Sequence, residues 1–310
     1  MTNQKLIAGN PENRQGCLRI LKYLLLSMRP EQWIKNLFVF AALLFSKNLL
    51  NPSKGIEALA GFTIFCMIAG CAYLVNDLID LERDKQHPVK SKRPIASGKL
   101  RKTIVIPVIL LIGCTSFFFA FSLDKVFGII VLCYFILNVN YSLYLKNIVI
   151  IDVATIAAGF VLRVWGGAVV ISVTASEWLF LCTLLLSLFL GFSKRRHELV
   201  LLADNAISHR TVLEHYSAYY LDQMISVVTA STVLCYAFYT MSDRTAESLG
   251  TSKLIYTLPF VLYGIFRYLY LVHQKEKGGN PADILLTDKP MIANVILWVI
   301  SSFLFIYVVH

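Results

Sequence analysis

Charged residues are scarce in this chain of 310 residues, and acidic residues are the fewest of them. Only 15% of the residues are charged, 57% are hydrophobic, and Asp plus Glu number 19 against 29 Lys plus Arg. A soluble globular domain carries about 25% charged residues, and the mean hydropathy here is +0.64. This balance argues against a disordered chain or a secreted enzyme, and it predicts an integral membrane protein.

Patterns of metal-binding or disulfide-forming residues are also lacking. The seven Cys residues lie almost all in apolar runs, with no Cys-x-x-Cys pair and no Cys/His cluster at metal spacing. We therefore expect the cysteines to be small core residues and expect His209, His215 and His273 to lie on the surface. The first 32 residues contain no uninterrupted apolar stretch followed by a small-residue cleavage site, so we expect no cleavable signal peptide.

Long apolar runs are abundant. A bilayer core about 30 Å thick needs about 20 helical residues, and nine runs of roughly this length carry charge mainly at their ends. The predicted fold is an all-α integral membrane protein, with residues 1–32 as a cytosolic N-terminal segment and residues 33–310 as one domain of nine transmembrane helices. The predicted spans are Trp33–Leu50, Gly55–Val75, Thr103–Phe121, Val126–Tyr144, Ile148–Ile171, Trp178–Phe192, Gln223–Met241, Leu254–Val272 and Met291–Val309.

Basic residues are distributed unevenly between the two sides of this predicted bundle. With the N-terminus in the cytosol, 23 of the 29 Lys and Arg lie within or near segments assigned to the cytosol. Because basic residues favour the cytosolic side, we expect a multi-pass protein of the cell (inner) membrane with its N-terminus inside and its C-terminus outside. This topology accounts for the net charge of +10 without a nucleic-acid partner.

Three carboxylates follow the second predicted span at helical spacing. Asp77, Asp80 and Asp84 occupy positions i, i+3 and i+7, which share one face of a helix that continues the span. One interpretation is a solvated helix end whose charges pair with Arg83 and Lys85. Like charges on one face repel, however, and Mg²⁺ takes oxygen ligands together with substrate phosphates. We therefore predict that this face binds Mg²⁺.

A basic loop follows these carboxylates directly. Lys90, Lys92 and Arg93 lie within four positions, and Pro88 and Pro94 stop a helix. Alone, the run would be explained by the positive-inside topology. Beside a metal-binding face it predicts a diphosphate site, because a metal and charge-assisted hydrogen bonds together hold phosphate oxygens.

Polar residues also mark the fifth predicted span and the loop after the sixth. Asp152, Thr155, Gly159 and Arg163 form one stripe of an otherwise apolar helix. Ionisable groups at such depth usually face a polar cavity or a partner, so we expect Asp152 to contact a sugar or assist the metal. We expect Arg163 to pair with an anion or a buried carboxylate. The basic residues 194–196 either hold a second phosphate or act as a positive-inside stop.

The segment 76–98 reads NDxxDxxxDxxHPxKxxRPIASG, and it resembles the first Asp-rich signature of the UbiA-type intramembrane prenyltransferase superfamily. A Tyr-x4-Lys element follows from Tyr141 to Lys146. Four further segments are similar to the polyprenyl-phosphate phosphoribosyltransferases of this superfamily, of which the decaprenyl-phosphate enzymes are familiar members. These segments are residues 29–36, 141–152, 191–199 and 279–288.

The resemblance implies a UbiA-like helical bundle with a central cavity that faces the cytosol. It implies transfer of 5-phosphoribosyl from phosphoribosyl pyrophosphate to a polyprenyl phosphate, with Mg²⁺ as cofactor and diphosphate as leaving group, toward a cell-wall arabinan precursor. The expected metal ligands are Asn76, Asp77, Asp80 and Asp84. The expected catalytic residues are Asp77, Asp80, Asp84 and Asp152. The expected substrate-binding residues are Lys35, Lys90, Arg93, Tyr141, Lys146, Arg163, Lys194 and Arg195.

One departure from the wider superfamily bears on the substrate. Members that consume prenyl diphosphates resemble one another in a second DxxxD motif after the sixth span, whereas this chain reads KRRHELVLLADNAISHR there. An aromatic or quinone-precursor prenyltransferase remains an alternative because the first motif is shared. A secondary transporter is a second alternative, since an intramembrane Asp and Arg are ordinary in transporters, although no inverted repeat is evident.

Overall fold

The computed structural model describes residues 11–201, 211–274, 284 and 286–308. All regular secondary structure in these ranges is helical, so the all-α prediction is confirmed. Eight helices are long and apolar enough to span a membrane. They are α3 (Pro52–Ile79), α5 (Lys102–Leu123), α6 (Lys125–Leu143), α7 (Ile151–Val170), α8 (Glu177–Leu201), α10 (Ala218–Met241), η5 (Lys253–Thr257) continued by α12 (Leu258–Gln274), and α14 (Lys289–Tyr307).

These eight helices coincide with the second to ninth predicted spans. The largest difference is in α8, which was expected to end at Phe192 and instead continues to Leu201. Its charged extension stays helical because its cations pair with carboxylates; Arg195 contacts Glu198 on the same helix and Arg196 contacts Asp222 on α10. The expected polar loop is therefore partly a helix that carries charged side chains.

The first predicted span, Trp33–Leu50, is not a continuous α-helix. It consists of the 3₁₀ helix η1 (Pro30–Phe40) and the short helix α2 (Ala41–Phe45), preceded by α1 (Pro11–Ser27). A 3₁₀ helix seldom exceeds four residues. Here its backbone packs directly against α7, because a Cβ built on Gly167 would lie only 2.0 Å from the carbonyl oxygen of Val39.

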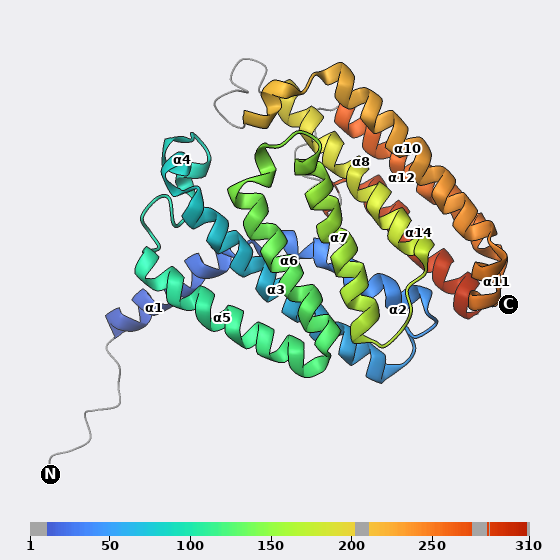
Figure 1. The fold of residues 1–310 in the computed structure, drawn as a ribbon, viewed down its shortest axis with the longest axis horizontal. Helices are drawn as coiled ribbons and strands as arrows, with labels where there is room; N and C mark the ends of the chain where they lie inside the picture. The colour runs from blue at the N-terminus through green and yellow to red at the C-terminus, as the bar shows by residue number, and fades with distance from the viewer. Residues whose placement is uncertain (1–10, 202–210, 275–283, 285, 309–310) are drawn as a thin grey trace, which may run out of the picture.

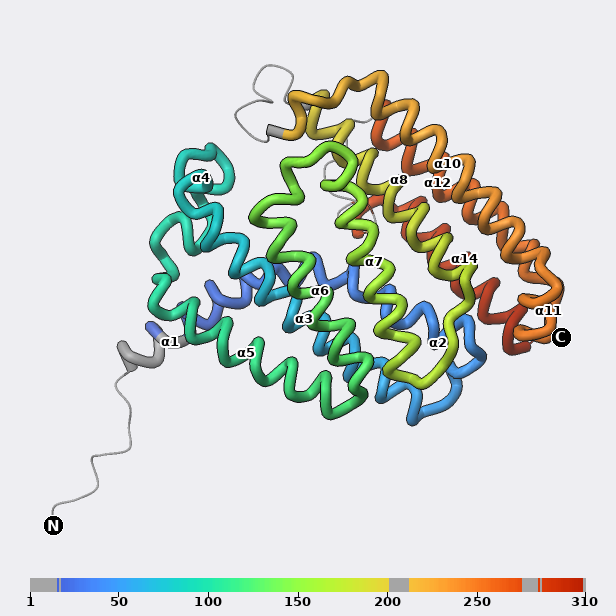
Figure 2. The backbone as a smooth tube through the Cα atoms, viewed as in Figure 1, coloured from blue at the N-terminus to red at the C-terminus, as the bar shows by residue number. Residues whose placement is uncertain are grey.

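The long helices form two packed groups that meet along α7 and α8 (Figures 1 and 2). Around η1, the helices α3, α6 and α7 enclose a core that includes Phe65, Phe127 and Ile130. On the other side, α8, α10, α12 and α14 enclose a second core that includes Phe189 and Leu221. Because η1 and α7 take part in both the packing and the polar interior, the first group positions the site described below.

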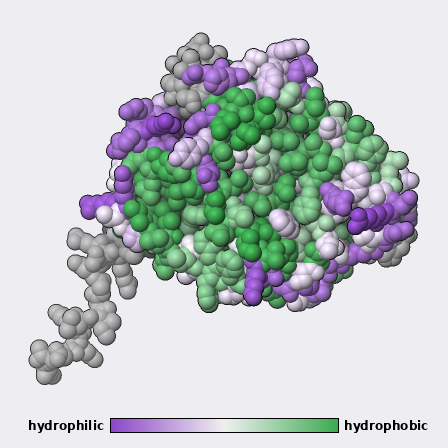
Figure 3. All heavy atoms as spheres, in the orientation of Figure 1, coloured by the Kyte–Doolittle hydropathy of each residue, from purple (hydrophilic) through white to green (hydrophobic). Residues whose placement is uncertain are grey.

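The outer surface is apolar across the middle of the molecule (Figure 3). Hydrophilic residues gather near α4 (Leu81–Gln86) and, at the other end, near α11 (Asp243–Leu249). Large apolar side chains such as Leu110 and Phe118 are more than 60% exposed, as expected for a lipid-facing surface. Cys114 and Cys133 are exposed there as well, so the expectation that the cysteines are core residues is wrong for these two.

Short elements cap the polar end near α4. They are η2 (Lys90–Lys92), η3 (Leu145–Asn147) and η4 (Thr211–His215). His215 in η4 and His273 at the end of α12 are exposed, as expected, whereas His209 lies outside the described residues. The ends of α3, α6 and α8 and the start of α7 converge at this end of the bundle.

The close approach at Gly167 yields a stability prediction. Gly167→Ala should lower the free energy of unfolding by about 1–3 kcal/mol, because the added methyl group meets backbone that cannot turn away. Gly113→Ala is the matched control, since nothing lies within 4 Å of a Cβ there; it should be neutral or stabilising by about 0.5–1 kcal/mol. Thermal unfolding of the two purified variants measures the difference, and equal stability would contradict the packing described here.

Candidate active site

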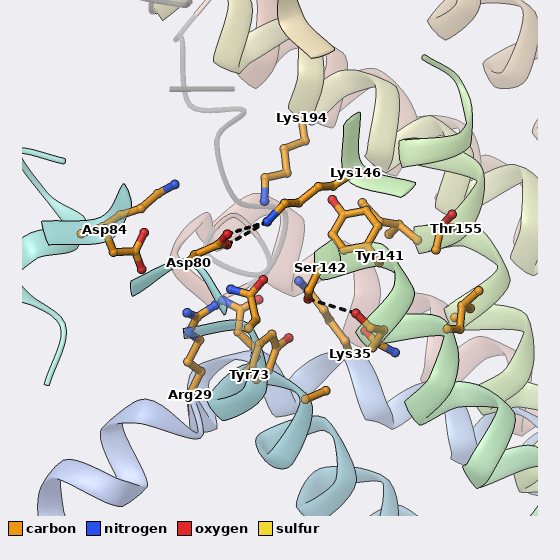
Figure 4. Close-up of a pocket in the computed structure, with 18 of the residues that line it drawn as sticks. Arg29, Lys35, Tyr73, Asp80, Asp84, Tyr141, Ser142, Lys146, Thr155 and Lys194 are labelled. Atoms are coloured by element: carbon orange, nitrogen blue, oxygen red, sulfur yellow. Dashed lines mark hydrogen bonds and ion pairs between the residues drawn. The ribbon is translucent and has the colours of Figure 1, made fainter. Parts of the chain in front are cut away.

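A cavity of about 820 Å³ opens at the polar end of the bundle. Its walls come from η1, α3, α4, η2, α6, η3, α7 and α8 (Figure 4). Ten of the residues expected to form a site line it: Lys35, Asn76, Asp80, Asp84, Lys90, Arg93, Tyr141, Lys146, Arg163 and Lys194. The fold thus brings together side chains that are up to 159 positions apart in the sequence.

The carboxylates at the end of α3 do lie together. Helix α3 ends at Ile79, and Asp80 forms the junction with α4. The helical hydrogen bonds continue across this junction, from the Asp80 N–H to Asn76 O at 2.9 Å and from the Asp84 N–H to Asp80 O at 2.8 Å. The spacing of the carboxylates therefore survives although the helix is divided in two.

Each of the three carboxylates contacts a cation from another part of the chain. Arg93 Nη1 lies 2.6 Å from Asp84 Oδ2 and 3.2 Å from Asp77 Oδ1, and Arg29 also contacts Asp77. Lys146 Nζ lies 2.7 and 2.9 Å from the two oxygens of Asp80. The carboxylates are thus neutralised by distant residues of the fold.

The simpler interpretation was that the carboxylates pair with their neighbours Arg83 and Lys85. The structure does not support this interpretation. Lys85 Nζ instead donates to Glu82, at 2.9 Å, and this hydrogen bond lowers the pKa of that exposed carboxyl group. Arg83 lines the cavity. Surface ion pairs of the Lys85 type contribute little to stability, so they do not explain why the carboxylates gather here.

Asp77 is placed differently from Asp80 and Asp84. It does not line the cavity, although Asp84, which is equally buried, does, and the Asp77 oxygen faces Arg29 and Arg93. Arg29 adopts a left-handed backbone conformation with φ of 54°, and its guanidinium lies 4.8 Å from the ring centre of Tyr73. Such backbone conformations are costly for residues other than Gly. Asp77 therefore supports the cavity wall from behind.

Arg163 lies at the inner end of the cavity and is 6% exposed. Its Nε donates to Asn36 Oδ1 at 2.7 Å, its Nη1 to Gly159 O at 2.9 Å, and its Nη2 to the Tyr134 hydroxyl at 2.6 Å. Within the described residues these hydrogen-bond partners are all neutral. A buried cation that faces a cavity in this way favours an anion as occupant.

Asp152 and Arg195, both expected to contact substrate or metal, form a buried ion pair behind the cavity. They are 0% and 1% exposed, and Arg195 Nε contacts Asp152 Oδ2. The Tyr216 hydroxyl donates to Asp152 at 2.8 Å, and burial raises the pKa of Tyr216, which keeps this donor protonated. Arg195 also contacts Glu198, and it donates to the Tyr141 hydroxyl in the cavity wall at 3.2 Å.

The same network reaches the turn that begins α7. The N–H of Ile150 donates to the Tyr216 hydroxyl at 2.7 Å, and Ile150 has a φ of 69°. A positive φ is strained for a β-branched residue, so the surrounding contacts must hold this turn in place. The turn also carries Lys146 in η3, which fixes where that lysine enters the cavity.

Several residues that line the cavity were not identified from the sequence. Among them are Arg29, Tyr134, Asn138 and Ser142. For Arg29 a signal existed, because it begins the segment 29–36 that supported the family resemblance. The other three come from α6, whose apolar sequence hides which side faces the cavity. Arg83, considered above only as a partner of the carboxylates, also lines the cavity. Asp283 lies outside the described residues, and Asp288 pairs with Arg267 and caps α14.

The cavity carries a large excess of positive charge. In the part of the chain that the structure describes, two acidic residues line it, Asp80 and Asp84. Eight basic residues in the same part line it: Arg29, Lys35, Arg83, Lys90, Arg93, Lys146, Arg163 and Lys194. Such an excess in a partly enclosed, low-dielectric space attracts anions strongly.

The oxygen donors at the end of α3 suit magnesium held jointly with a phosphate. Among the described residues, no three His, Cys, Asp or Glu side chains form a metal cage. However, Mg²⁺ is usually held by one or two carboxylates together with substrate phosphates and water. Asp80, Asp84 and the side chain of Asn76 provide this partial donor set on the cavity wall.

A bundle of helices long enough to span a membrane, with a cationic cavity and an acidic helix end, forms a site suited to anionic ligands. Residues 36–283 match the model of the UbiA prenyltransferase family. This match covers most of the chain, so the chain belongs to that family, and the resemblance inferred from its motifs is confirmed.

Known relatives and solved structures agree with this assignment. A decaprenyl-phosphate phosphoribosyltransferase of Corynebacterium glutamicum is 30% identical over 309 residues, which cover 96% of this chain and 90% of the relative. The enzyme of the same name from Mycobacterium tuberculosis is 29% identical over 88% of this chain and 90% of its own. A UbiA homologue from Archaeoglobus fulgidus, solved with GPP and Mg²⁺, has a TM-score of 0.70 at 18% identity, covering 92% and 100% of the chains.

The buried pair of Asp152 and Arg195 yields a second prediction. Asp152→Asn should lower the free energy of unfolding by up to about 3–5 kcal/mol, because it removes the buried counter-ion of Arg195 and leaves the arginine with the partly exposed Glu198. Arg195→Gln should cost a similar amount, and the double variant should lose clearly less than the sum of both. Thermal unfolding measures all three variants. Single variants as stable as the parent protein would show that the pair does not support the fold.

Proposed function

We propose that the chain transfers the 5-phosphoribosyl group of phosphoribosyl pyrophosphate to a polyprenyl phosphate, of decaprenyl type, and releases diphosphate in a Mg²⁺-dependent reaction. The observation that carries this proposal is the cavity in which eight basic residues surround two carboxylates. The names of the relatives, decaprenyl-phosphate phosphoribosyltransferases that match over most of this chain, support the choice of substrates.

The charge of the cavity fits two phosphorylated substrates. A phosphate monoester carries a charge of about −1.5 to −2 at neutral pH, and this pair of substrates contains two of them in addition to a diphosphate. One magnesium ion offsets only part of this charge, so the remainder requires cationic side chains. The basic excess of the cavity meets this requirement.

An aromatic prenyltransferase is the less well supported alternative. Such an enzyme would be expected to supply a second acidic pair from the end of α8. In the described part of α8, the residue that lines the cavity is Lys194, while Arg195 and Arg196 pair with Asp152 and Asp222. This end of the cavity is therefore suited to a second anion.

In the proposed reaction, a phosphate oxygen of the lipid forms a bond to C1 of the ribose, and the bond from C1 to the diphosphate oxygen breaks. The electron pair leaves with the diphosphate, and C1 gains oxocarbenium character, as in glycosyl transfer. The acceptor oxygen is already deprotonated because the second pKa of a phosphate monoester is about 6. The reaction therefore requires no general base.

The main task of this chain is to hold two like-charged substrates together. Asn76, Asp80 and Asp84 would hold Mg²⁺, which neutralises the leaving diphosphate when bound. Five residues of the cavity wall, Lys35, Lys90, Tyr141, Arg163 and Lys194, would bind phosphate or ribose oxygens. Asp77, Asp152 and Arg195 would position these groups from behind, because they are buried outside the cavity.

The proposed topology places the cavity mouth at the cytosolic face, where phosphoribosyl pyrophosphate would enter from water and the lipid from the bilayer. It includes nine crossings, with η1 and α2 forming the first. Eleven residues of 3₁₀ helix and five of α-helix extend about 30 Å, which equals the thickness of the bilayer core. The N-terminus would lie inside and the C-terminus outside, and residues 33–310 would form one catalytic domain.

Diphosphate release by the purified protein in lipid nanodiscs tests this function. We expect release from phosphoribosyl pyrophosphate only when polyprenyl phosphate and Mg²⁺ are both present. Asp80→Asn and Asp84→Asn should each lower kcat by at least about 100-fold, because each removes a charge that helps to hold the leaving group. Both variants should still insert, because Asn keeps the shape of the side chain. Asp84→Asn should be the less stable of the two, since Asp84 is 3% exposed and pairs with Arg93.

The substrate combinations distinguish the alternatives. Release of diphosphate from a prenyl diphosphate with an aromatic acceptor would identify an aromatic prenyltransferase. Uptake of a solute by proteoliposomes without release of diphosphate would identify a transporter. Full activity of both Asn variants would contradict the metal assignment.

A further inference from the structure

Lys146 and Asp80 form the ion pair that lies most directly in the way of the proposed magnesium site. Lys146 Nζ contacts both carboxylate oxygens, at 2.7 and 2.9 Å. The two side chains are 14% and 18% exposed, and both line the cavity (Figure 4). Lys146 comes from η3 and Asp80 from the junction of α3 and α4, so the pair joins two elements 66 positions apart.

This pair and a magnesium ion compete for the same oxygens. Mg²⁺ requires close contact with its ligands in a strict octahedral geometry, and the ammonium of Lys146 occupies the space in front of both Asp80 oxygens. Two cations at one carboxylate also repel each other. Coordination by Asp80 therefore requires that the ammonium of Lys146 move away.

The other two pairs near this site are less able to exchange. Asp77 is buried beneath both Arg29 and Arg93, and Arg93 Nη1 lies between Asp77 and Asp84. A guanidinium that bridges two carboxylates is fixed by several contacts at once. Lys146 instead carries a compact charge on a flexible four-carbon chain, and within the described residues its ammonium donates to Asp80.

The position of Lys194 indicates where the ammonium of Lys146 would move after it leaves Asp80. Both lysine side chains point toward the cavity, and Lys146 pairs with Asp80 (Figure 4). Within the described residues, Lys194 Nζ lies 3.8 Å from Glu198 Oε1. Two ammonium groups that converge in one cavity repel each other unless an anion lies between them. A diphosphate there would stabilise both.

We propose that Lys146 is an exchangeable counter-ion of Asp80: it holds the carboxylate in place and moves to the diphosphate when the metal takes the carboxylate. This inference rests on the proposed function. Its consequence is that metal and diphosphate depend on each other to bind. When the metal binds alone, it must push Lys146 toward Lys194, and the two ammonium groups repel each other because no anion lies between them. When diphosphate binds alone, it is repelled by Asp80 and Asp84 because no metal lies between them. By linkage, each ligand raises the affinity for the other by the same factor.

Metal binding without substrate tests the proposal. The purified full chain is titrated with Mn²⁺, a magnesium substitute whose free concentration is measured by electron paramagnetic resonance. Lys146→Gln should lower the Kd for Mn²⁺ alone by about tenfold or more, a factor within the usual range of such couplings. Lys146→Arg, which retains a cation near Asp80, should keep the weak affinity of the parent protein.

Lys194→Gln is the matched control. It removes the same charge from the same cavity, but its lysine does not contact Asp80 in the structure. It should change the Kd for Mn²⁺ alone by less than about threefold, as expected for a charge effect without direct contact. Binding of ³²P-labelled inorganic diphosphate in the presence of Mg²⁺ should weaken in both Gln variants, because each loses a proposed phosphate ligand.

The outcomes separate this inference from the proposed function. If Lys146→Gln and Lys194→Gln change the affinity for Mn²⁺ alone to the same extent, or if neither changes it, Lys146 is not a competing counter-ion and the inference fails by itself. If the parent protein binds neither Mn²⁺ nor magnesium diphosphate, both the inference and the proposed magnesium site fail.

Discussion

The structure depends on the compensation of positive charge inside a membrane-embedded cavity. Cations are costly in such surroundings unless they have partners. Among the described residues, eight cations line one cavity together with two carboxylates. The carboxylates at the end of α3 compensate part of this charge through Arg93 and Lys146. The remaining excess explains why an anionic ligand is the natural occupant, and why the end of α3 lies at the mouth of the cavity.

The ionised groups fall into two sets with different tasks. Asp152 and Arg195 form a buried pair behind the wall, and the buried carboxylate of Asp77 is held by Arg29 and Arg93; these contacts fix the positions of helices. Such pairs are expensive to break and therefore rigid. The pair of Asp80 with Lys146 lies in the wall itself and is partly exposed. The rigid ion pairs behind the wall keep the shape of the site. The more mobile pair in the wall allows charged side chains to rearrange around a substrate.

Much of this arrangement could be predicted from the sequence, for identifiable reasons. The length and hydropathy of the apolar runs located eight helices within a few residues, and helical spacing placed Asp80 and Asp84 together at the end of one of them. The 3₁₀ geometry of η1 could not be predicted, because it follows from contact with Gly167 across the bundle. The burial of Asp152 and Arg195 could not be predicted either. Each charged residue was recognisable in the sequence, but nothing in the sequence showed that the two would pair.

We expect the end of α3 to bind a magnesium-bound diphosphate beside a second anion. The decisive measurement is a structure determined with phosphoribosyl pyrophosphate and Mg²⁺. We expect density for the diphosphate between Asp80, Asp84 and Lys194, with the ammonium of Lys146 moved from Asp80 to a phosphate oxygen. Density for the sugar phosphate elsewhere in the molecule, or a diphosphate bound without contact to Asp80 or Asp84, would contradict it.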